Sequence, residues 1–279
     1  MSAPLWEDRF HLCLDGRLPE PMVLPVCGGT AVLCSIPSPD ESDRVNEDGA
    51  LIAELDDQGG VLCVADGAGG LRRGDLACKL ALESLAAALA AKDSGSDLRS
   101  RVMSAFEDAH QRIISLGIGA ATTLAGVIIH GGRLRSFHAG DSRILVTGQR
   151  GRKKLASLPH SPVAYAVEAG FLDEEAALSH DQLHLVSNLV GISDARIDLS
   201  ASIRLAPRDT VLIASDGLFD NFLPDEVVER VRTGDLVESV RELMLEAGAR
   251  MRGEGSDRSG KMDDLTILAY RPGPGDSGR

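Results

Sequence analysis

Strand-like and helix-like segments follow one another in blocks along this chain. Three strand-like segments come first, at residues 30–35, 50–54 and 61–65, and a pair of helix-like segments follows. Strands then return, and a second helix pair and a last strand complete the order. This order differs from the regular βαβ alternation that builds a parallel sheet. It predicts an α+β fold, a four-layer α-β-β-α sandwich of two antiparallel sheets flanked by helix pairs.

The later segments support the same layered arrangement. Apolar stripes predict helices at residues 74–92 and 97–116 and a helix pair within 224–251. Further strands are expected at 122–129, 133–138, 143–147, 202–205, 210–214 and 265–270. The stretch from 148 to 194 is more polar, with helix candidates at 173–178 and 183–189, and we expect a mobile surface element there.

Length and composition point to one catalytic domain. The chain has 279 residues and a hydrophobic content of 43%, which is enough for a large core. We expect the domain at residues 29–272. Residues 1–28 show no clear period and are interpreted as an N-terminal extension of unknown role. The Pro- and Gly-rich tail at 273–279 is expected to be disordered.

Charge and terminal sequence exclude several classes of partner. Lys and Arg number 29, Asp and Glu number 42, and the net charge is −13, which is the wrong sign for binding nucleic acid. The chain starts without a signal-peptide pattern, and no apolar run approaches the ~20 residues of a membrane span. We therefore expect a cytoplasmic protein without nucleic-acid or membrane partners. A monomer is a separate expectation. The five cysteines show no Cys-x-x-Cys spacing, which disfavours a zinc ribbon.

Four acidic turns place carboxylates beside glycine or another acid. They are Asn46-Glu47-Asp48-Gly49, Asp66-Gly67, Asp216-Gly217 and Asp263-Asp264. Apolar runs come directly before Asp66 and Asp216, so both acids are expected at strand ends, along one edge of the sandwich. A single Asp-Gly pair is usually only a turn. Several carboxylates brought together repel one another unless divalent cations neutralise them, so the set predicts a metal site.

The ligand types indicate which chemistry such a site performs. Carboxylates and a backbone carbonyl at Gly67 suit hard cations such as Mg²⁺ or Mn²⁺ rather than Zn²⁺. Two such ions can activate a water molecule and neutralise a phosphoryl group, so phosphate ester hydrolysis is the expected reaction. Arg44 could supply a bidentate contact to the phosphate. The chain lacks both a Cys with an Arg six positions on and a P-loop sequence, which disfavours those phosphate chemistries.

Together these motifs resemble those of the metal-dependent type 2C serine/threonine protein phosphatases. The resemblance extends over residues 30–271, and the motifs occur in the family's order. They are Arg44-Val45-Asn46-Glu47-Asp48, Val64-Ala65-Asp66-Gly67-Ala68-Gly69-Gly70, Ala121-Thr122-Thr123-Leu124, Ala139-Gly140-Asp141-Ser142-Arg143, Ala214-Ser215-Asp216-Gly217-Leu218-Phe219-Asp220 and Asp263-Asp264-Leu265-Thr266. The resemblance implies the family's β-sandwich flanked by helices, in agreement with the order of the segments.

The resemblance also implies a set of metal ligands. Asp66 would bridge two Mn²⁺ or Mg²⁺ ions. Asp216 and Asp263 would complete the ligands of one ion, and Glu47 with the Gly67 carbonyl would hold the other. Asp66, Asp216 and Asp263 are thus the expected catalytic residues.

Further residues take their expected roles from the same resemblance. Asp48 would lie beside the metal ligands and hydrogen-bond to their waters, and Asp141 matches an acid that helps to hold a weaker third metal. Arg44 would contact the substrate phosphate, although it stands one residue nearer the Glu-Asp pair than is usual. Residues 160–191 correspond to the flap, a segment beside the active site that influences substrate choice in the family.

The implied reaction is hydrolysis of phosphoserine and phosphothreonine in phosphorylated proteins, opposing a Ser/Thr kinase. A water activated between two metal ions would attack phosphorus without a phosphoenzyme. Ala68 stands where many eukaryotic members carry a histidine proposed to protonate the leaving oxygen, which excludes a side-chain acid at this position. A pseudophosphatase that binds partners without catalysis is the alternative, as is a regulatory phosphatase for one dedicated partner.

Overall fold

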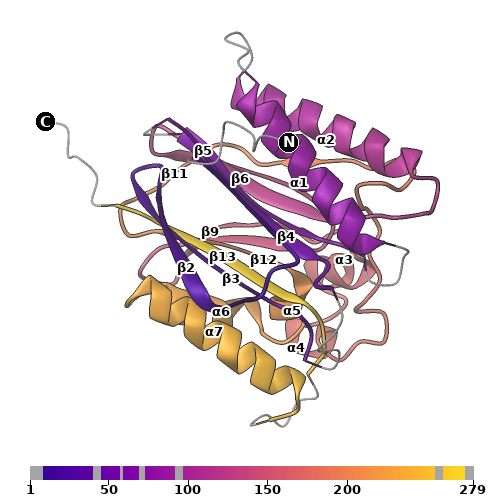
Figure 1. The fold of residues 1–279 in the computed structure, drawn as a ribbon. Helices are drawn as coiled ribbons and strands as arrows, with labels where there is room; N and C mark the ends of the chain where they lie inside the picture. The colour runs from indigo at the N-terminus through magenta and orange to yellow at the C-terminus, as the bar shows by residue number, and fades with distance from the viewer. Residues whose placement is uncertain are drawn as a thin grey trace, which may run out of the picture.

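Two antiparallel sheets lie face to face in the computed structural model, with helices on the outer face of each sheet (Figure 1). The structure describes residues 9–39, 45–56, 59–68, 73–91, 97–254 and 260–273. This arrangement confirms the predicted four-layer α-β-β-α sandwich. Because strand ends of both sheets meet along one edge, loops from distant parts of the chain can build a common site there.

The first sheet contains seven strands within the described ranges. In spatial order they are β1 (Phe10–Leu14), β4 (Asp48–Asp56), β5 (Gly59–Asp66), β6 (Leu124–His130), β7 (Arg133–Ala139) and β10 (Asp198–Leu199), and β11 (Ile203–Arg204) also pairs with β7. All of these pairs are antiparallel.

The second sheet contains six strands within the same ranges. In spatial order they are β2 (Leu18–Val26), β3 (Gly29–Ile36), β13 (Leu265–Pro272), β12 (Thr210–Ala214), β8 (Arg143–Thr147) and β9 (Lys153–Ala156). These pairs are also antiparallel. The short connection from β7 to β8 therefore passes from one sheet to the other.

Helix pairs form the two outer layers, as predicted. The first sheet is covered by α1 (Gly74–Ala90) and α2 (Leu98–Ser115), and the second by α6 (Pro224–Val231) and α7 (Leu236–Met251) (Figure 1). The shorter helices are α3 (Pro162–Glu168), α4 (Glu174–Ala177) and α5 (Asp216–Phe219). No helix among the described residues combines the length and the apolar character that a membrane span requires.

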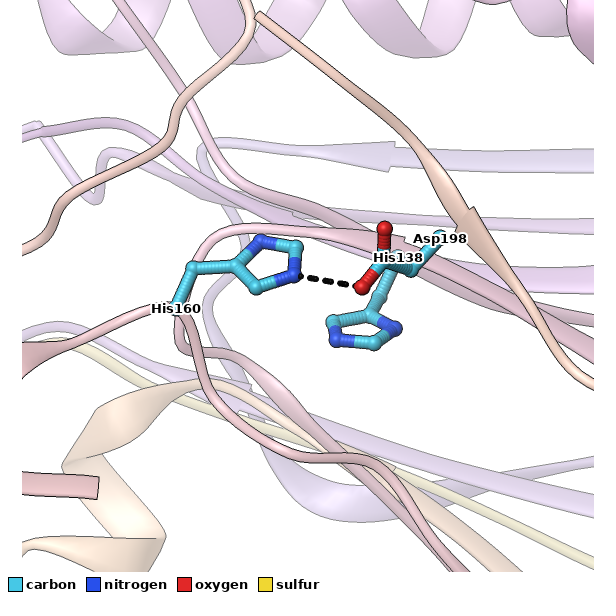
Figure 2. Close-up of side chains that lie close together, drawn as sticks. All are labelled: His138, His160 and Asp198. Carbon is cyan, nitrogen blue, oxygen red and sulfur yellow. Dashed lines mark hydrogen bonds and ion pairs between the residues drawn. The ribbon is translucent and has the colours of Figure 1, made fainter. Parts of the chain in front are cut away.

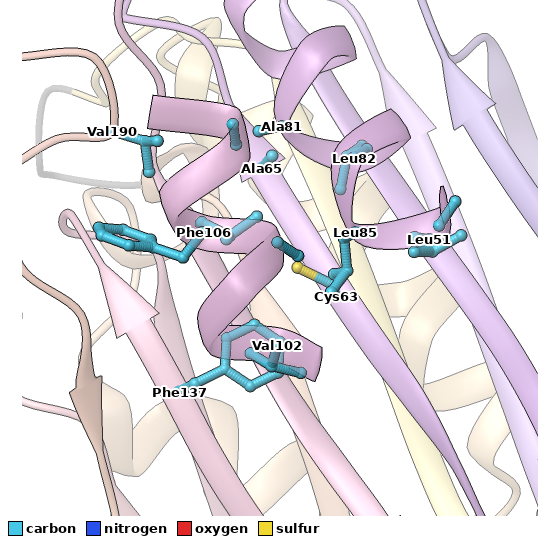
Figure 3. Packing of buried hydrophobic residues seen from close by; sticks show 14 of the residues in the cluster. Leu51, Cys63, Ala65, Ala81, Leu82, Leu85, Val102, Phe106, Phe137 and Val190 are labelled. Carbon is cyan, nitrogen blue, oxygen red and sulfur yellow. The ribbon is translucent and has the colours of Figure 1, made fainter. Parts of the chain in front are cut away.

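Burial on both faces explains the unbroken apolar run of β5. Val61 and Cys63 pack beneath α1 and α2, whereas Leu62 and Val64 pack against the second sheet. Figure 3 shows Cys63 beside Leu85 in the layer under the helices. A strand of this kind has no solvent-facing side and so shows no polar alternation. The buried strand ends at Asp66, which it carries to the edge of the sheet.

The segment predicted as an N-terminal extension supplies two strands. β1 pairs with β4 in the first sheet, and β2 pairs with β3 in the second. Residues 10–26 therefore extend both sheets of the sandwich. At the other end of the chain, the Gly273 amide donates to the Gly28 carbonyl at 3.0 Å. The remainder of the predicted tail, residues 274–279, lies outside the described residues.

The segment predicted to be the flap, residues 160–191, contains α3 and α4. The sequence predicted the second of these helices but not the first, and it did not predict β9. The helix predicted at 183–189 is wrong. Ser187 N donates to the His160 carbonyl at 2.8 Å, and Val190 N donates to the Thr122 carbonyl at 2.9 Å. Partners outside the segment therefore take the amide hydrogens that a helix would pair internally.

Candidate metal centre

Asp48 and Asp66 lie opposite each other on neighbouring strands. Asp48 begins β4, Asp66 ends β5, and the antiparallel register pairs the two residues directly. The main chain of Asp66 is held by Thr123: Asp66 N donates to Thr123 Oγ1 at 2.9 Å, and Thr123 N donates to the Asp66 carbonyl at 2.8 Å. The two carboxyl groups therefore share one edge of the first sheet.

Asp216 and Asp263 come from the second sheet. Asp216 directly follows Ser215 at the end of β12 and is the first residue of α5, and Asp263 lies two residues before β13. In the antiparallel pair formed by these strands, Ala214 lies opposite Ile267. The end of β12 thus lies beside the beginning of β13, and the two acids come from the same end of the sheet.

One hydrogen bond and one electrostatic cluster join the acids of the two sheets. Ser215 Oγ donates to Asp48 Oδ2 at 2.7 Å across the sandwich. Burial raises the pKa of Asp66 well above its ordinary range, and four neighbouring carboxylates raise it further, namely Asp48, Asp216, Asp263 and Asp141. Since charges act strongly on one another only over a few ångströms, the structure brings these predicted residues together.

Glu47 and the Gly67 carbonyl both lie close to Gly74. Gly67 N donates to the Glu47 carbonyl at 3.1 Å, which joins the two loops. A side chain on Gly74, the first residue of α1, would come within 2.9 Å of the Gly67 carbonyl oxygen and 3.0 Å of Glu47 Oε1. Glycine at this position therefore keeps the space beside both oxygens open.

The N-terminal segment holds the loop that carries Glu47 and Asp48. Asn46 N donates to Asp15 Oδ1 at 3.1 Å, and Asn46 Nδ2 donates to the Gly16 carbonyl at 2.8 Å. In turn, Asp48 N donates to Asn46 Oδ1 at 2.9 Å. Residues that follow β1 thus position the acidic pair.

Asp264 has a positioning contact that the sequence did not reveal. Its Oδ1 accepts a hydrogen bond from Ser38 N at 2.8 Å, and its Oδ2 accepts one from Glu47 N at 2.7 Å. Asp264 is buried, so its carboxylate requires such donors. It ties the loop before β13 to the loop before β4.

Lys261 places a positive charge among the acids, and sequence reasoning missed it. Its Nζ donates to Asp216 Oδ2 at 2.9 Å and to Asp220 Oδ2 at 2.6 Å, and it lies 3.4 Å from Asp263 Oδ2. Burial opposes the charged form of Lys261, but the carboxylates outweigh burial and raise its pKa. The signal available in the sequence was a lone lysine two residues before a predicted ligand.

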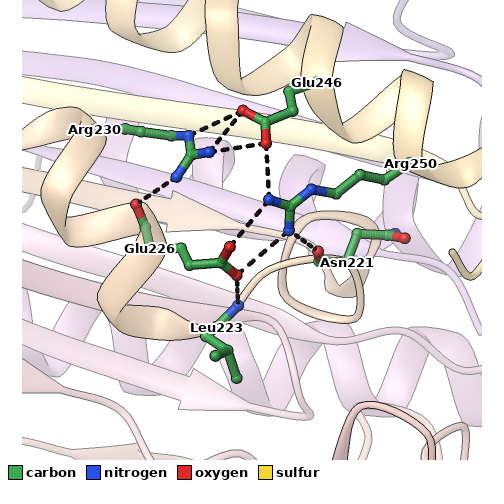
Figure 4. Close-up of polar contacts among 6 residues, drawn as sticks. All are labelled: Asn221, Leu223, Glu226, Arg230, Glu246 and Arg250. Carbon is green, nitrogen blue, oxygen red and sulfur yellow. Dashed lines mark hydrogen bonds and ion pairs between the residues drawn. The ribbon is translucent and has the colours of Figure 1, made fainter. Parts of the chain in front are cut away.

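A hydrogen-bond network fixes the main chain at Lys261. Lys261 N donates to Asn221 Oδ1 at 3.0 Å, and Asn221 Nδ2 donates to the Lys261 carbonyl at 2.9 Å. Figure 4 shows that Arg250 holds Asn221 in turn, with Arg250 Nη1 donating to the Asn221 carbonyl at 2.6 Å. Arg250 also pairs with Glu226 at 3.0 Å and with Glu246 at 2.7 Å. The α6–α7 pair thus supports the edge of the sandwich where Asp48, Asp66, Asp216 and Asp263 gather, which we call the acidic edge.

Three further acids also have raised pKa values. Burial, followed by the carboxylates of Asp216 and Asp220, raises the pKa of Asp141 to about 8. Burial and the carboxylate of Asp216 raise the pKa of Asp263 to about 7 against the opposing charge of Lys261. Burial raises the pKa of Asp220 to about 6. Lys261 therefore does not neutralise the whole cluster.

The donor set fits hard divalent cations. It consists of carboxylate and carbonyl oxygens, which Mg²⁺ and Mn²⁺ prefer. Asp48 is buried, and its Oδ1 has no hydrogen-bond partner among the described residues. A buried carboxylate oxygen without a partner is costly unless a cation or an ordered water satisfies it.

The sequence singled out positions 44 and 68 for contacts to the substrate phosphate and to the leaving group. Arg44 lies outside the described residues, so its predicted phosphate contact stays a prediction. Ala68 directly follows the Asp66-Gly67 turn, and its amide donates to the Ala121 carbonyl at 3.0 Å. Its methyl group cannot donate a proton.

A second cluster is formed by His138, His160 and Asp198 (Figure 2). It lies beside the Gly140–Asp141 turn, to which His160 is hydrogen-bonded. Gly140 N donates to His160 Nδ1 at 3.1 Å, and Asn188 Nδ2 lies 2.7 Å from the same nitrogen. Since a backbone amide can only donate, His160 Nδ1 must be the acceptor and the proton must be on Nε2. Nε2 then donates to Asp198 Oδ2 at 3.1 Å, which disfavours metal ligation by this nitrogen.

A two-sheet sandwich with oxygen ligands clustered on one edge has the features of a metal-dependent phosphoester hydrolase. A family model described as protein phosphatase 2C matches residues 38–251. A protein phosphatase 2C-type protein of Streptococcus pyogenes is 30% identical over 227 residues, covering 78% of this chain and 88% of the relative. The chain belongs to the protein phosphatase 2C family.

Other relatives agree in sequence and in fold. A serine/threonine phosphatase, stp, of Listeria welshimeri is 26% identical over 237 residues, with 80% of this chain and 88% of the relative covered. The solved structure of the S. agalactiae serine/threonine phosphatase has a TM-score of 0.73 and 26% identity, and covers 86% of this chain and 98% of that chain. The chain is therefore a metal-dependent hydrolase of the serine/threonine phosphatase class.

Proposed function

We propose that five groups of the acidic edge would hold two Mn²⁺ or Mg²⁺ ions, with Asp66 contributing to both sites. The five groups are Asp66, Asp216, Asp263, Glu47 and the Gly67 carbonyl. The observation that carries this proposal is the convergence of carboxylates from both sheets on a cluster that raises the pKa of Asp66. Asp48 Oδ1, which is buried and has no hydrogen-bond partner in the described part of the chain, supports it. Asp141 is the proposed contributor to a weaker third site.

The bound ions supply charge neutralisation of the phosphate and activation of a water molecule for attack. The chain's own residues orient the reactants. Ser215 holds one oxygen of Asp48, which leaves the other oxygen as an acceptor for a water proton at this edge. The water oxygen bonds to phosphorus as the bond to the serine or threonine oxygen breaks. Ala68 offers no acid, so the proton that the leaving oxygen takes must come from another donor, such as a water molecule at this edge.

Replacement of Asp66 tests the assignment. Asp66→Asn removes one negative charge from the centre of the cluster while keeping the side-chain shape. We expect Mn²⁺-dependent hydrolysis of a phosphoserine peptide to fall by about two to three powers of ten, as when one group that stabilises transition-state charge is removed. Asp225→Asn is a suitable control, because Asp225 is exposed and pairs with Lys153 at 2.8 Å, away from the cluster.

Parent-rate hydrolysis by a folded Asp66→Asn variant would reject the site assignment. The same assay separates the enzyme from a pseudophosphatase, since Mn²⁺-dependent release of phosphate from a small aryl phosphate should disappear upon chelation. If the unmodified protein binds Mn²⁺ but releases no phosphate, the catalytic proposal fails and the binding-module alternative gains support.

Phosphorylated proteins are the substrate class of the family, and the finer assignments are proposals. We propose a cytoplasmic monomer that opposes a Ser/Thr kinase, without nucleic-acid or membrane partners. The net charge of −13 supports the exclusion of nucleic acid. Capture of phosphoproteins by the Asp66→Asn variant from the source cells, followed by mass spectrometry, would identify substrates. Light scattering would test the monomer.

A further inference from the structure

His160 lies where the flap meets the turn that carries Asp141. The residue is 1% exposed, and its main chain and ring both contact Gly140. His160 N donates to the Gly140 carbonyl at 3.0 Å, and Gly140 N donates to His160 Nδ1 at 3.1 Å. Both backbone groups of Gly140 are thus paired with the first residue of the flap.

The other end of the flap is bound to the same residue. Ser187 N and Ser187 Oγ both donate to the His160 carbonyl, at 2.8 Å and 2.9 Å. Asn188 Nδ2 donates to His160 Nδ1 at 2.7 Å. The Asn188 side chain also donates to the main-chain carbonyl of Arg196 and accepts from the main-chain amide of Arg196. His160 therefore joins the beginning and the end of the flap.

A continuous set of contacts leads from this junction to the proposed metal centre. Gly140 has a φ of 106°, and a side chain there would meet Thr123 at 2.6 Å, so the turn packs closely on Thr123. Thr123 Oγ1 lies 2.7 Å from Ser142 Oγ and accepts a hydrogen bond from Asp66 N at 2.9 Å. The turn is therefore held between Asp66 and His160.

The Nε2 side of the His160 ring has a contact that does not lead toward the proposed metal centre. Its Nε2 donates to Asp198, whose side chain is 53% exposed, and it stacks on His138 with a centroid separation of 4.5 Å (Figure 2). An exposed acceptor can be replaced by water at little cost. Loss of the Nδ1 acceptor is different, because it leaves the buried Gly140 amide without a partner.

We propose that His160 is a positioning residue that couples the position of the flap to the position of the Gly140–Asp141 turn. A protein substrate that contacts the flap would thereby influence the position of Asp141. In the other direction, the residues of the acidic edge would orient the flap. This inference rests on the proposed function for its catalytic meaning. The coupling itself concerns hydrogen bonds of the chain and can be measured without turnover.

Two substitutions separate the two sides of the ring. His160→Asn places an amide oxygen near the position of Nδ1 and keeps the acceptor for Gly140, whereas His160→Gln places an amide nitrogen near Nε2 and keeps the contact to Asp198. In metal-free protein we expect His160→Gln to accelerate hydrogen exchange by about tenfold, at residues 140–142 and 187–190 together. His160→Asn should retain wild-type exchange at Gly140.

Kinetics provide the second readout. With Mn²⁺ present, His160→Gln should raise the KM for a phosphopeptide by about tenfold, because the flap is no longer oriented. Its KM for a small aryl phosphate, which is too short to reach the flap, should stay at the wild-type value. His110→Gln is the matched control, since His110 Nδ1 accepts a hydrogen bond from Gly191 N at 3.3 Å, away from the turn. It should leave exchange at residues 140–142 unchanged.

Wild-type exchange at residues 140–142 in His160→Gln would overturn the proposal, as would equal damage by folded His160→Asn. If His160→Gln does not fold, Asn188→Ala tests the flap side alone. It should accelerate proteolysis within the flap and raise the phosphopeptide KM without changing the KM for the aryl phosphate. Wild-type values for both would overturn the coupling. Exchange changes in a protein that lacks phosphatase activity would reject the proposed function and leave the coupling intact.

Discussion

At the scale of single residues, Lys261 brings a positive charge to the acidic edge. Its ammonium group contacts the side chains of Asp216 and Asp220 and approaches Asp263. It therefore neutralises part of a cluster that would otherwise repel itself. A divalent cation bound to Asp216 and Asp263 would compete for the same oxygens, so Lys261 should lower the affinity for the metal while stabilising the metal-free protein.

Lys261→Met should reverse both effects. Without the ammonium group, the metal-free protein should lose about 2 kcal/mol of unfolding free energy, because buried carboxylates lose their partner. Mn²⁺ should bind about tenfold more tightly, since it no longer displaces an internal cation. Urea denaturation in chelator and calorimetric titration with Mn²⁺ measure the two quantities.

Lys154→Met is the matched control. Lys154 is 30% exposed and pairs with Asp209 at 2.5 Å, whereas Lys261 is 28% exposed. The control variant should lose the same stability with and without Mn²⁺, while the loss in Lys261→Met should largely disappear once the metal is bound. Equal Mn²⁺ affinity in Lys261→Met and the unmodified protein would contradict the competition.

At the scale of elements, the α6–α7 pair supports the loop that carries Lys261 and Asp263. Arg250 connects Glu226 with Glu246, and its guanidinium lies 3.7 Å from the centre of the Phe222 ring. Through Asn221, the same residue reaches the Lys261 main chain. A change on the outer helix layer should therefore be detectable at the metal edge.

Arg250→Met should cost about 2 kcal/mol of unfolding free energy, because two partly buried glutamates lose their shared partner. It should also accelerate hydrogen exchange at residues 261–264. Arg252→Met provides the comparison, since the pair that Arg252 forms with Glu254 is exposed at 47% and 60% and is expected to contribute little to stability. Equal effects of the two substitutions would show that the network is not coupled to the loop.

The N-terminal strand is a second element with an expected influence on the site. β1 pairs with β4, and Asp15 and Gly16 hold Asn46 beside the predicted ligand Glu47. Deletion of residues 1–17 should remove about 3 kcal/mol of stability through lost apolar burial and should weaken Mn²⁺ binding. Calorimetry on the purified deletion variant measures both. Unchanged stability and Mn²⁺ affinity would mean that β1 is dispensable.

At the scale of the whole molecule, metal-free stability should depend on pH. The pKa values of Asp141, Asp263 and Asp220 are raised to about 8, about 7 and about 6, whereas the ordinary value for Asp is about 4. The folded state therefore holds protons that the unfolded state releases. The stability contributed by these groups is complete below about pH 4 and declines as the pH rises through about 6 to 8.

In chelator, the Tm should therefore be higher at about pH 5.5 than at about pH 8.5. Mn²⁺ should reverse the difference, since it binds the deprotonated carboxylates and stabilises the folded state. Differential scanning calorimetry across this range, with and without Mn²⁺, tests the expectation. A metal-free Tm that increases with pH would show that the cluster does not hold the raised pKa values.

Most strands and all four longer helices could be predicted from the sequence. The run at residues 61–65 is apolar throughout because both faces of β5 are buried, and Asp66-Gly67 marks its end. The helix predicted at 183–189 was wrong because His160 and Thr122 take its backbone donors. Local composition carries information on burial and on turns, but not on a partner supplied by a distant segment.

The acid-rich turns and their suitability for hard cations follow from residue type and spacing alone. The links that assemble them follow from chain topology: Ser215 meets Asp48 across 167 positions, and Asp264 meets Glu47 across 217. Lys261 among the acids and His160 between the turn and the flap are likewise long-range contacts. They form only when the two sheets pack, because side-chain hydrogen bonds and ion pairs depend on distances of a few ångströms that no local pattern specifies.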